Sequence, residues 1–593
     1  MNRRGLIKKT ILSFLLYGYS SKRGSNAESL CRNRVIEDEK CSMPEMFGAK
    51  VDGDFNNKKA IEDALLHSYK TGLPCVFSNG LYNSDDIEFY FPVSIIIENG
   101  SFLNFSLTIS GHRLNITDTV RTVLGWEECP SSKDSFPLSL GLFRPGDIIA
   151  LQLDDEYGGN AKHGNENGLD ILEVKSSNTS TISFRNKTRL AYSKPSFGKL
   201  NQVTRINGSL DKGAKLINGN FEGVFSVGDI LRIENIDGKD SVSGSKFYFE
   251  YIKVKQIVEE HMILESRTIY SYENPWVIGT GFLRQVHITG NGGIKKLVIR
   301  NSSDVIITSL SVKRLIVSNC YGLNISNVKS EGLQEPSTIN ITYCFGKSII
   351  NNLTVSNSLS VTDNAALKIM SSPQLILSDI IISDSNSSSK KQSNYCLFVD
   401  AFYTPYLCWN DNIIVSNVIC EKPNSNFSRG AWFYGLRNSI VDSIVGTDVF
   451  FQGSVDTMFE RINIPGYSLE IKDLIRCTVH SKCSKVLFQG GQQNILNLMY
   501  GNVKDKKGLS KEKIIKFTYG KINPETGVNY SKGESNFLAL NGQSWISENS
   551  YPSISIEYQD KMAIDTGVVS NELERKIFNI GSDVSILSIK DRY

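Results

Sequence analysis

Acidic and aromatic residues gather in one segment, residues 395–411, which reads YCLFVDAFYTPYLCWND. Hydrolysis of a glycosidic bond needs two carboxyl groups beside the scissile oxygen, one as acid and one as base or nucleophile. Sugars also present C–H faces that stack on aromatic rings. The segment therefore predicts a site for a sugar, with carboxyl groups of the kind that such hydrolysis would need. Its candidate catalytic acids are Asp400 and Asp411, and its candidate substrate-binding residues are Tyr403, Tyr406 and Trp409.

Neighbouring segments supply further candidates. If Leu397 points inward in a strand, alternation sends Phe398 and Asp400 outward together. Lys368 then takes the matching outward position one repeat earlier. The remaining candidates are Glu421 as a third catalytic acid, Lys368, Arg429 and Trp432 as substrate-binding residues, and Glu331 and Glu335 in reserve.

Two other interpretations of these residues stay open. The aromatic residues can simply pack a loop, with solvated acids around it. Alternatively, β-elimination at a uronic acid needs a base and a cation, which Tyr403, Tyr406 or Lys422 can supply. None of the 6 histidines falls between residues 288 and 479, which disfavours a histidine base.

The cysteines do not indicate a metal or cofactor site. There are 11, so they cannot all pair within the chain, and none forms a C-x-x-C motif typical of structural zinc. Most lie in apolar strand patterns, where a free thiol behaves as a small hydrophobe. We expect buried, reduced cysteines, no cofactor and no metal ion.

Short apolar strands separated by polar turns recur from about residue 295. Residues 297–307 (LVIRNSSDVII) match residues 315–325 (LIVSNCYGLNI), and the shape returns at residues 339, 367, 397, 432, 450 and 487. Periods near ~20 residues without helical stretches predict a solenoid of stacked strands rather than leucine-rich repeats. Between positions 367 and 432 the chain is longer than compact coils require, so loops must protrude there. Loops on a rigid scaffold commonly carry function.

The segment before the repeats predicts a helix. Residues 46–66 read MFGAKVDGDFNNKKAIEDALL, with a DG turn signal and an N-cap at Asn56 or Asn57. The AI pair at 60–61 and the AL pair at 64–65 fall on one helical face. A short strand and a tight turn therefore lead into an amphipathic helix.

Pattern changes divide the rest of the chain. Residues 73–290 read as short strands broken by turns, with one phrase occurring twice, FRPGDII at 143–149 and FSVGDIL at 225–231. Residues 552–558 alternate like an antiparallel strand. We expect five segments: 1–29, an anchor or signal-like peptide; 30–72, an entry motif with the helix; 73–290, a β-rich part; 291–503, the solenoid; and 504–593, a separate C-terminal β domain for trimerisation or carbohydrate binding.

Charge and hydropathy exclude two classes of partner. The formal net charge is +3, from 65 Lys and Arg against 62 Asp and Glu, and no basic patch lies beyond residue 23. Nucleic-acid binders carry a larger, clustered basic excess. No apolar stretch reaches the ~18 residues that a membrane span needs.

The N-terminal segment has two possible roles. Residues 1–16 (MNRRGLIKKTILSFLL) fit either a signal peptide cleaved near residue 27 or an anchor peptide that docks on another protein.

The FGA at 47–49, the DG at 52–53 and the helix pairs at 60–61 and 64–65 resemble the opening motif of the pectate-lyase-like superfamily. That superfamily has a right-handed parallel β-helix whose mouth is capped by the helix. Val51 here replaces a usual glycine. The Asn-Thr-Asp, Asp-Asp and Gly-His-Gly motifs of plant-type polygalacturonases are missing, so pectin hydrolysis of that kind is not expected.

In pattern, residues 46–500 are also similar to bacteriophage tailspike depolymerases. This resemblance implies an all-β homotrimer on a phage tail that binds and depolymerises bacterial capsular polysaccharide or exopolysaccharide during host attachment. It also implies that the N-terminal peptide attaches to another tail protein. The alternatives are a non-catalytic carbohydrate-binding adhesin and an exported β-helix polysaccharide lyase or hydrolase of cellular origin.

Overall fold

The structure is a computed structural model of the 593-residue chain. It describes residues 40–120, 128–129, 135–136, 143–153, 169–178, 181–188, 192–193, 195–234, 248–331, 338–356, 359–360, 365–383, 386–387, 394–403, 406–407, 409–420, 428–446, 448–500, 514–518, 533–534, 536–540, 553–557, 559–560, 562–565, 577–580 and 584–587. The expected N-terminal peptide, residues 1–29, lies outside the described residues, as do Glu335 and Glu421.

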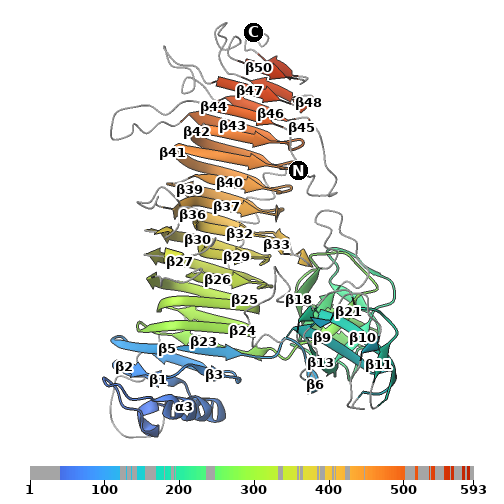
Figure 1. Cartoon of the computed structure of the whole chain (residues 1–593), viewed down its shortest axis with the longest axis vertical. Coiled ribbons are helices and arrows are strands. Elements are labelled where there is room, and N and C mark those ends of the chain that lie inside the picture. Colours follow the sequence, from blue (N-terminus) through green and yellow to red (C-terminus); the bar gives the residue numbers. More distant parts are fainter. Residues whose placement is uncertain are drawn as a thin grey trace.

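The long body of the molecule is a parallel β-helix, which confirms the expected fold (Figure 1). Each strand pairs in parallel with the rung before and after it, within one sheet of 27 strands. The predicted repeats follow this register, because Leu297 pairs with Leu315, which pairs with Ile339. Among the described residues, no helix is long and apolar enough to cross a membrane.

The first coils contain β1 (Cys75–Phe77), β2 (Gly80–Asn83), β3 (Ile87–Phe89), β4 (Ser94–Ile97) and β5 (Ser101–Ser110). The following rungs contain β22 (Leu283–Arg284), β23 (His287–Thr289), β24 (Gly293–Thr308), β25 (Ser311–Glu331), β26 (Ile339–Thr342), β27 (Ser348–Ser356), β29 (Ala365–Met370), β30 (Leu375–Ile382), β32 (Asn394–Asp400), β36 (Ile414–Cys420), β37 (Ser428–Tyr434), β39 (Ile440–Val445), β40 (Val449–Gln452), β41 (Met458–Lys472), β42 (Thr478–Gln489) and β43 (Ile495–Tyr500). The last rungs contain β44 (Ile514–Thr518), β46 (Phe537–Leu540), β47 (Ser553–Glu557), β49 (Met562–Asp565), β50 (Ile577–Ile580) and β51 (Val584–Leu587).

Three faces of the β-helix matter for function. Face A is formed by β26, β29, β32, β37, β40 and the end of β41. After a turn, face B is formed by the first halves of β27, β30, β36 and β39, and face C by their second halves. Stacked left-handed residues, such as Asn352 and Asn417, mark the bend from face B to face C. Asparagine tolerates that conformation better than most residues.

One continuous apolar core fills the β-helix. Inward residues of neighbouring rungs, such as Leu367, Leu397 and Phe433, are fully buried in a cluster that extends from Ile61 to Leu538. Burial of apolar surface contributes about 25 cal/mol per Å², so this ladder is the main stabilising term. The eight cysteines whose side chains the structure describes form no disulfide bond, and all of them except Cys41 are buried, as the sequence predicted.

A helix caps the first coil. α3 (Lys58–Thr71), preceded by the short 3-10 helix η1 (Pro44–Phe47), buries the predicted face, with Ile61, Ala64 and Leu65 fully shielded. Asn57 occupies the N-cap position, but its side chain does not cap the helix. Its amide oxygen instead accepts a hydrogen bond from the Lys50 N–H at 2.8 Å. Asn57 therefore ties the helix to the preceding turn.

An inserted domain, residues 116–279, interrupts the β-helix between β5 and β22 and consists of two similar units. The first contains β6 (Ile116–Val120), β7 (Glu128–Cys129), β8 (Ser135–Phe136), β9 (Ile148–Leu153), β10 (Leu169–Ser177), β11 (Ile182–Phe184), β12 (Tyr192–Ser193) and β13 (Pro195–Leu200). The second contains β14 (Val203–Arg205), β15 (Ser209–Leu210), β16 (Leu216–Asn218), β17 (Ile230–Glu234), β18 (Phe249–Val258), β19 (His261–Leu264), β20 (Tyr272–Glu273) and β21 (Trp276–Gly279). Their sheet orders correspond strand for strand, β6-β13-β9-β10-β11-β8 and β14-β21-β17-β18-β19-β16.

The phrase that occurs twice in the sequence forms the same turn in both units. The Gly146 N–H donates to the Val174 carbonyl at 2.8 Å, and the Gly228 N–H donates to the Val254 carbonyl at 2.8 Å. Phe143 and the matching Phe225 are both buried. The inserted domain is therefore an internal duplication of one small β unit.

Two expected boundaries differ from the structure. Residues 73–290 are not one unit, because β1–β5 already belong to the β-helix and only residues 116–279 are inserted. Residues 504–593 do not form a separate antiparallel domain in their described part, because β44, β47 and β50 continue the parallel ladder, as do β46, β49 and β51. Alternation with period two is common to both kinds of strand when one side is buried, so the sequence pattern did not distinguish them.

Candidate functional site

An outward-facing row of aromatic side chains runs along face A. Lys368, Phe398, Trp432 and Phe450 occupy one column on four successive rungs, in register. The predicted alternation is confirmed, because Leu397 is buried inside, Phe398 faces outward, and Lys368 pairs with Phe398 on the preceding rung.

The aromatic rings contact one another closely. The Trp432 ring centroid lies 5.0 Å from that of Phe398, 5.1 Å from that of Phe450 and 5.0 Å from that of Tyr395. Tyr395 and Phe398 stack with centroids 5.3 Å apart. We call Tyr395, Phe398, Trp432 and Phe450 the aromatic row. Such a surface offers several apolar ring faces in a line, which suits a chain of sugar rings.

Polar atoms border the aromatic row. The Lys368 Nζ lies 5.8 Å from the centre of the Phe398 ring. The Trp432 indole N–H has no hydrogen-bond partner among the described residues. An indole N–H is only a donor, and this one is shielded from solvent, so Trp432 offers a ligand its ring face.

Two carboxyl groups border the aromatic row in register: the exposed Glu470, which pairs with Phe450 on the next rung, and the more buried Asp400.

Asp400 lies at the edge of the row where β32 meets the following turn. It ends β32, two residues after Phe398, and is 7% exposed. Tyr434 lies on the next rung, because Val399 pairs with Phe433. Burial, and to a smaller extent the charges of Asp400 and Asp473, raise the pKa of Tyr434 to about 12. The phenol therefore stays protonated at neutral pH.

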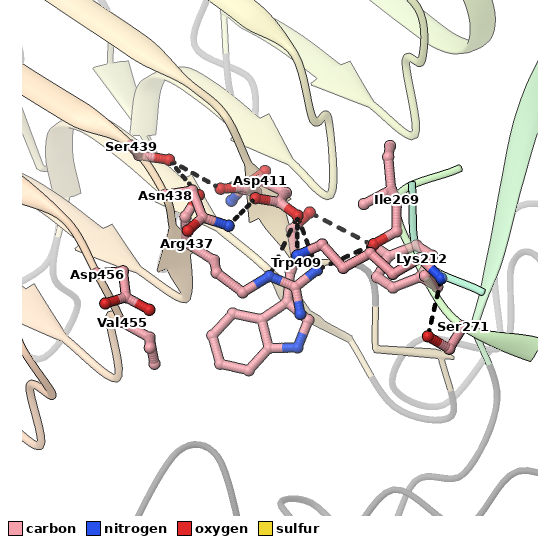
Figure 2. Close-up of polar contacts among 12 residues, drawn as sticks. Lys212, Ile269, Ser271, Trp409, Asp411, Arg437, Asn438, Ser439, Val455 and Asp456 are labelled. Atoms are coloured by element: carbon pink, nitrogen blue, oxygen red, sulfur yellow. Dashed lines mark hydrogen bonds and ion pairs between the residues drawn. The ribbon is translucent and has the colours of Figure 1, made fainter. Parts of the chain in front are cut away.

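Asp411 lies at a different place, in the turn between faces A and B (Figure 2). It belongs to β35 (Asn410–Asp411), which pairs with β38 (Leu436–Arg437). Its side chain is fully buried. The Oδ2 atom accepts from the Arg437 Nη2 at 2.8 Å and from the Lys212 Nζ at 3.2 Å, and the Oδ1 atom accepts from the Asn438 Nδ2 at 2.9 Å. Lys212 comes from the inserted domain, so this cluster joins the two parts of the molecule.

Trp409 belongs to the same junction. It is 7% exposed and lies in an apolar cluster that contains residues of the inserted domain and of the β-helix turns. The Arg437 guanidinium lies 5.5 Å from the Trp409 ring and 5.7 Å from the Tyr270 ring of the inserted domain. The geometry of Asp411 and Trp409 is that of a domain junction, and neither side chain is open to a sugar.

We expect Asp411→Asn to act mainly on stability. Asp411 is fully buried, but its partners Arg437 and Lys212 are 21% and 45% exposed, so the loss should be smaller than the about 3–5 kcal/mol of a fully buried ion pair. Differential scanning calorimetry should show a lower unfolding temperature, while cleavage per folded molecule is retained. The matched control is Asp456→Asn on a nearby rung, whose partly exposed pair with Arg476 contributes only about 0–1 kcal/mol. Loss of cleavage at unchanged stability would instead restore Asp411 as a catalytic acid.

Glu250 makes the stability of the junction between the inserted domain and the β-helix depend on pH. Its carboxylate is buried and accepts from the Tyr272 hydroxyl at 2.8 Å and from the Ile269 N–H at 3.1 Å. The Ile269 carbonyl in turn accepts from the Arg437 Nη2 at 3.4 Å. Burial raises the pKa of Glu250 from 4.5 to about 7, and Asp411 adds to the rise.

We expect the free energy of unfolding to fall as the pH rises from about 4.5 to about 7. In this window the folded carboxyl holds a proton that the unfolded chain has lost, and the slope is at most about 1.4 kcal/mol per pH unit. Above pH 7 the effect of this group is constant. Glu250→Gln should remove the slope in thermal unfolding at constant ionic strength. An identical pH dependence in both proteins would contradict the assignment.

The remaining predicted residues have less defined places. Tyr403 and Tyr406 lie in a small antiparallel hairpin, β33 (Phe402–Tyr403) and β34 (Tyr406–Leu407), which follows β32. Arg429 lies in β37, where it pairs with Tyr395. Glu331 is exposed at the end of β25.

The structure adds four residues to the candidate site that sequence reasoning missed. They share outward positions on face A or the turn that follows it, and they are Tyr395, Tyr434, Phe450 and Asp473. Most of them could have been found from the strand alternation. Every second residue of a predicted strand faces outward, and the matching position in the next repeat lies beside it. No group of three His, Cys, Asp or Glu side chains in the described part of the chain is placed to hold a metal ion.

Comparisons with known proteins give distant likenesses. The sequence matches no protein-family model. The Gp54 tailspike of Acinetobacter baumannii bacteriophage AP22, in complex with A. baumannii capsular saccharide, is 9% identical with a TM-score of 0.35, over 93% of this chain and 76% of that chain. The tailspike gp49 of Pseudomonas phage LKA1 is 10% identical with a TM-score of 0.36, over 92% and 78%. The tailspike gp61 of Pseudomonas phage phi297 is 10% identical with a TM-score of 0.40, over 89% and 76%.

Proposed function

We propose that this protein binds bacterial capsular polysaccharide or exopolysaccharide along face A and cleaves its glycosidic bonds. The observation that carries the proposal is the aromatic row in register on successive rungs, with the carboxyl group of Asp400 at its border. Rungs repeat every ~4.8 Å, so a polymer lying along the axis meets an equivalent position on each rung. The bacterial substrate comes from the sequence resemblance to tailspike depolymerases.

Hydrolysis is the favoured reaction. In this proposal Asp400 is the catalytic acid that protonates the leaving oxygen, and Lys368 and Trp432 bind the sugar. Asp473 is the candidate second carboxyl group, because it and Asp400 both act on Tyr434. Three rungs separate their strands, about 14 Å at the backbone. That spacing is too wide for a retaining enzyme, whose carboxyl groups stand about 5–5.5 Å apart. An inverting enzyme, with carboxyl groups about 6.5–9.5 Å apart, would require both side chains to reach toward each other.

β-Elimination is less favoured. It requires a base near the substrate, and one tyrosine of this surface, Tyr434, has a pKa raised to about 12. A raised pKa makes the deprotonated phenol scarce at neutral pH. Glu421, which lies outside the described residues, remains a candidate acid.

A carbohydrate-binding protein without catalysis is the second candidate. It is favoured by one observation: the residues in register with Asp400 on the neighbouring rungs are Met370 and Tyr434, so neither supplies a second carboxyl group. Such a protein would use the aromatic row and bind the polymer intact.

Incubation with purified capsular polysaccharide separates these possibilities. A hydrolase releases reducing ends without new ultraviolet absorbance, whereas a lyase also generates an absorbing unsaturated uronate. Binding without any oligosaccharide product would favour the adhesin. Neither binding nor cleavage across a panel of capsules would overturn the proposal.

The proposal places the protein on a phage tail at the host surface. Residues 1–29 would then attach it to another tail protein. In the alternative, an exported enzyme of cellular origin, residues 1–27 are removed. Sequencing the N-terminus of the mature protein distinguishes the two.

A further inference from the structure

Positively charged side chains gather on face A, on the side of the aromatic row that leads to the capping helix. Face A continues there through the end of β5 and the first halves of β24 and β25, which pair in turn with β26. Lys296 and Arg300 lie on β24, each next to a residue of the buried core, so both face outward. Arg314 is in register with Lys296 on the next rung. We call Lys296, Arg300 and Arg314, which are all half-buried, the basic cluster.

No acid neutralises the basic cluster from the outward positions around it. On the rungs from β5 to β29, the other outward residues of face A in register are Ser, Thr, Asn, Val, Ile, Met and the cation Lys368. The nearest acids on this face are Asp86 and Glu88 at the rung of β3, two steps from β24. Asp86 already accepts from a backbone N–H of β5 at 3.0 Å, and Glu88 accepts from the Tyr90 hydroxyl. This part of face A therefore has a local excess of positive charge.

The charge beyond the other end of the aromatic row is mixed. There Glu470 is in register with Phe450, and Lys472 lies two residues further along the same strand. An acid and a base therefore accompany each other on that side, whereas the basic cluster contains only bases. Lys296 and Arg300 also form no ion pair with another described residue.

The basic cluster lies in line with the aromatic row. Two steps lead from β25, which carries Arg314, to β29, which carries Lys368, and a third step reaches Phe398. At ~4.8 Å per step, the backbone of Arg314 is about 10 Å from that of Lys368 and about 14 Å from that of Phe398. A polymer that lies on the aromatic row and continues toward the capping helix therefore passes first over Lys368 and then over the basic cluster.

We propose that the polysaccharide bound on face A is anionic, and that the basic cluster binds the carboxylate or phosphate groups of its repeating unit. This inference rests on the proposed function, because it concerns the same polymer on the same face. The polymer then lies with uncharged sugar faces on the aromatic row and with charged groups on the side of the capping helix.

The chemistry of the side chains selects an anionic polymer. A guanidinium group presents its N–H donors in a fork that matches two oxygens of a carboxylate or a phosphate, and an ammonium group adds a compact charge beside it. A bound polymer also displaces water from these half-buried cations. That displacement costs free energy, which a neutral polymer does not offset with an opposite charge.

The test is calorimetric titration of the full chain with capsular polysaccharide, in the Asp400→Asn background. We expect the double variant Lys296→Gln, Arg300→Gln to bind about four- to 25-fold more weakly, from about two- to fivefold for each charge. Sodium chloride should weaken binding by the parent protein more than binding by the double variant, because salt screens the removed charges. The matched control is Lys329→Gln, Lys482→Gln, which removes two exposed cations from face C and should bind as the parent does.

A second comparison identifies the anionic group. The same capsule is titrated in its native form and after reduction of its carboxyl groups to alcohols. Weaker binding after reduction identifies a carboxylate. Unchanged binding after reduction, with the salt dependence retained, identifies a phosphate. Both results support the inference.

Three results would overturn the inference and leave the proposed function in place. They are binding of an uncharged capsule, unchanged binding by the double variant, and an equal loss in the face C control. Binding of no capsule at all is a different result, because it overturns the proposed function and this inference with it.

Discussion

Asp400→Asn is expected to reduce polysaccharide cleavage by about 10²–10⁴-fold, the usual contribution of a general acid or base. The amide has the same shape as the carboxyl group but cannot deliver a proton to the leaving oxygen. Because Asp400 lies at the end of an outward column, the change removes no apolar contact from the core. The measurement is the initial rate of reducing-end release from purified capsule, at equal concentrations of folded protein.

The control for this variant is Asp379→Asn. Asp379 is an exposed acid at the bend between faces B and C, with a φ of 56° that asparagine also accepts. Its oxygen accepts from the Asn417 Nδ2 at 2.6 Å, and an amide oxygen can replace it. This variant should keep full activity. Full activity in Asp400→Asn as well would remove Asp400 from the mechanism and leave Asp473 and Glu421 as candidates.

The β-helix could be predicted because its physical cause is local. Each rung repeats the same inward apolar positions, so Leu297, Leu315 and Leu367 reveal the register in the sequence itself. The end of the β-helix was not predictable in the same way. The alternation of apolar and polar residues in 553–557 indicates only that one side of the strand is buried. The pairing with β44 in the structure shows that the strand is parallel.

The candidate site was predicted in part for a related reason. Alternation from Leu397 places Asp400 outward, and the repeat places Lys368 beside Phe398, so these positions followed from the sequence. The role of Asp411 could not be predicted from the sequence, because its partner Lys212 lies about 200 residues earlier, in the inserted domain. An ion pair across such a sequence separation leaves no periodic signal. An acid among aromatic residues therefore looked catalytic when it belongs to a junction.

Trp432→Ala is expected to weaken polysaccharide binding at least thirtyfold. Trp432 contacts Tyr395, Phe398 and Phe450, so it is the centre of the aromatic row. Truncating a central aromatic anchor typically costs about 2 kcal/mol or more, and every ~1.4 kcal/mol is a tenfold change in Kd. Binding is best measured by calorimetry in the Asp400→Asn background, so that the polymer is not consumed during the titration.

Two further variants test the role of the ring face. Trp432→Phe keeps an aromatic ring of smaller area, so its loss of binding should be smaller than that of Trp432→Ala. Phe55→Ala removes an aromatic side chain that is 50% exposed near the capping helix and should leave binding unchanged. Equal losses in Trp432→Phe and Trp432→Ala would mean that binding requires the larger indole ring. Unchanged binding in both would move the polysaccharide away from face A.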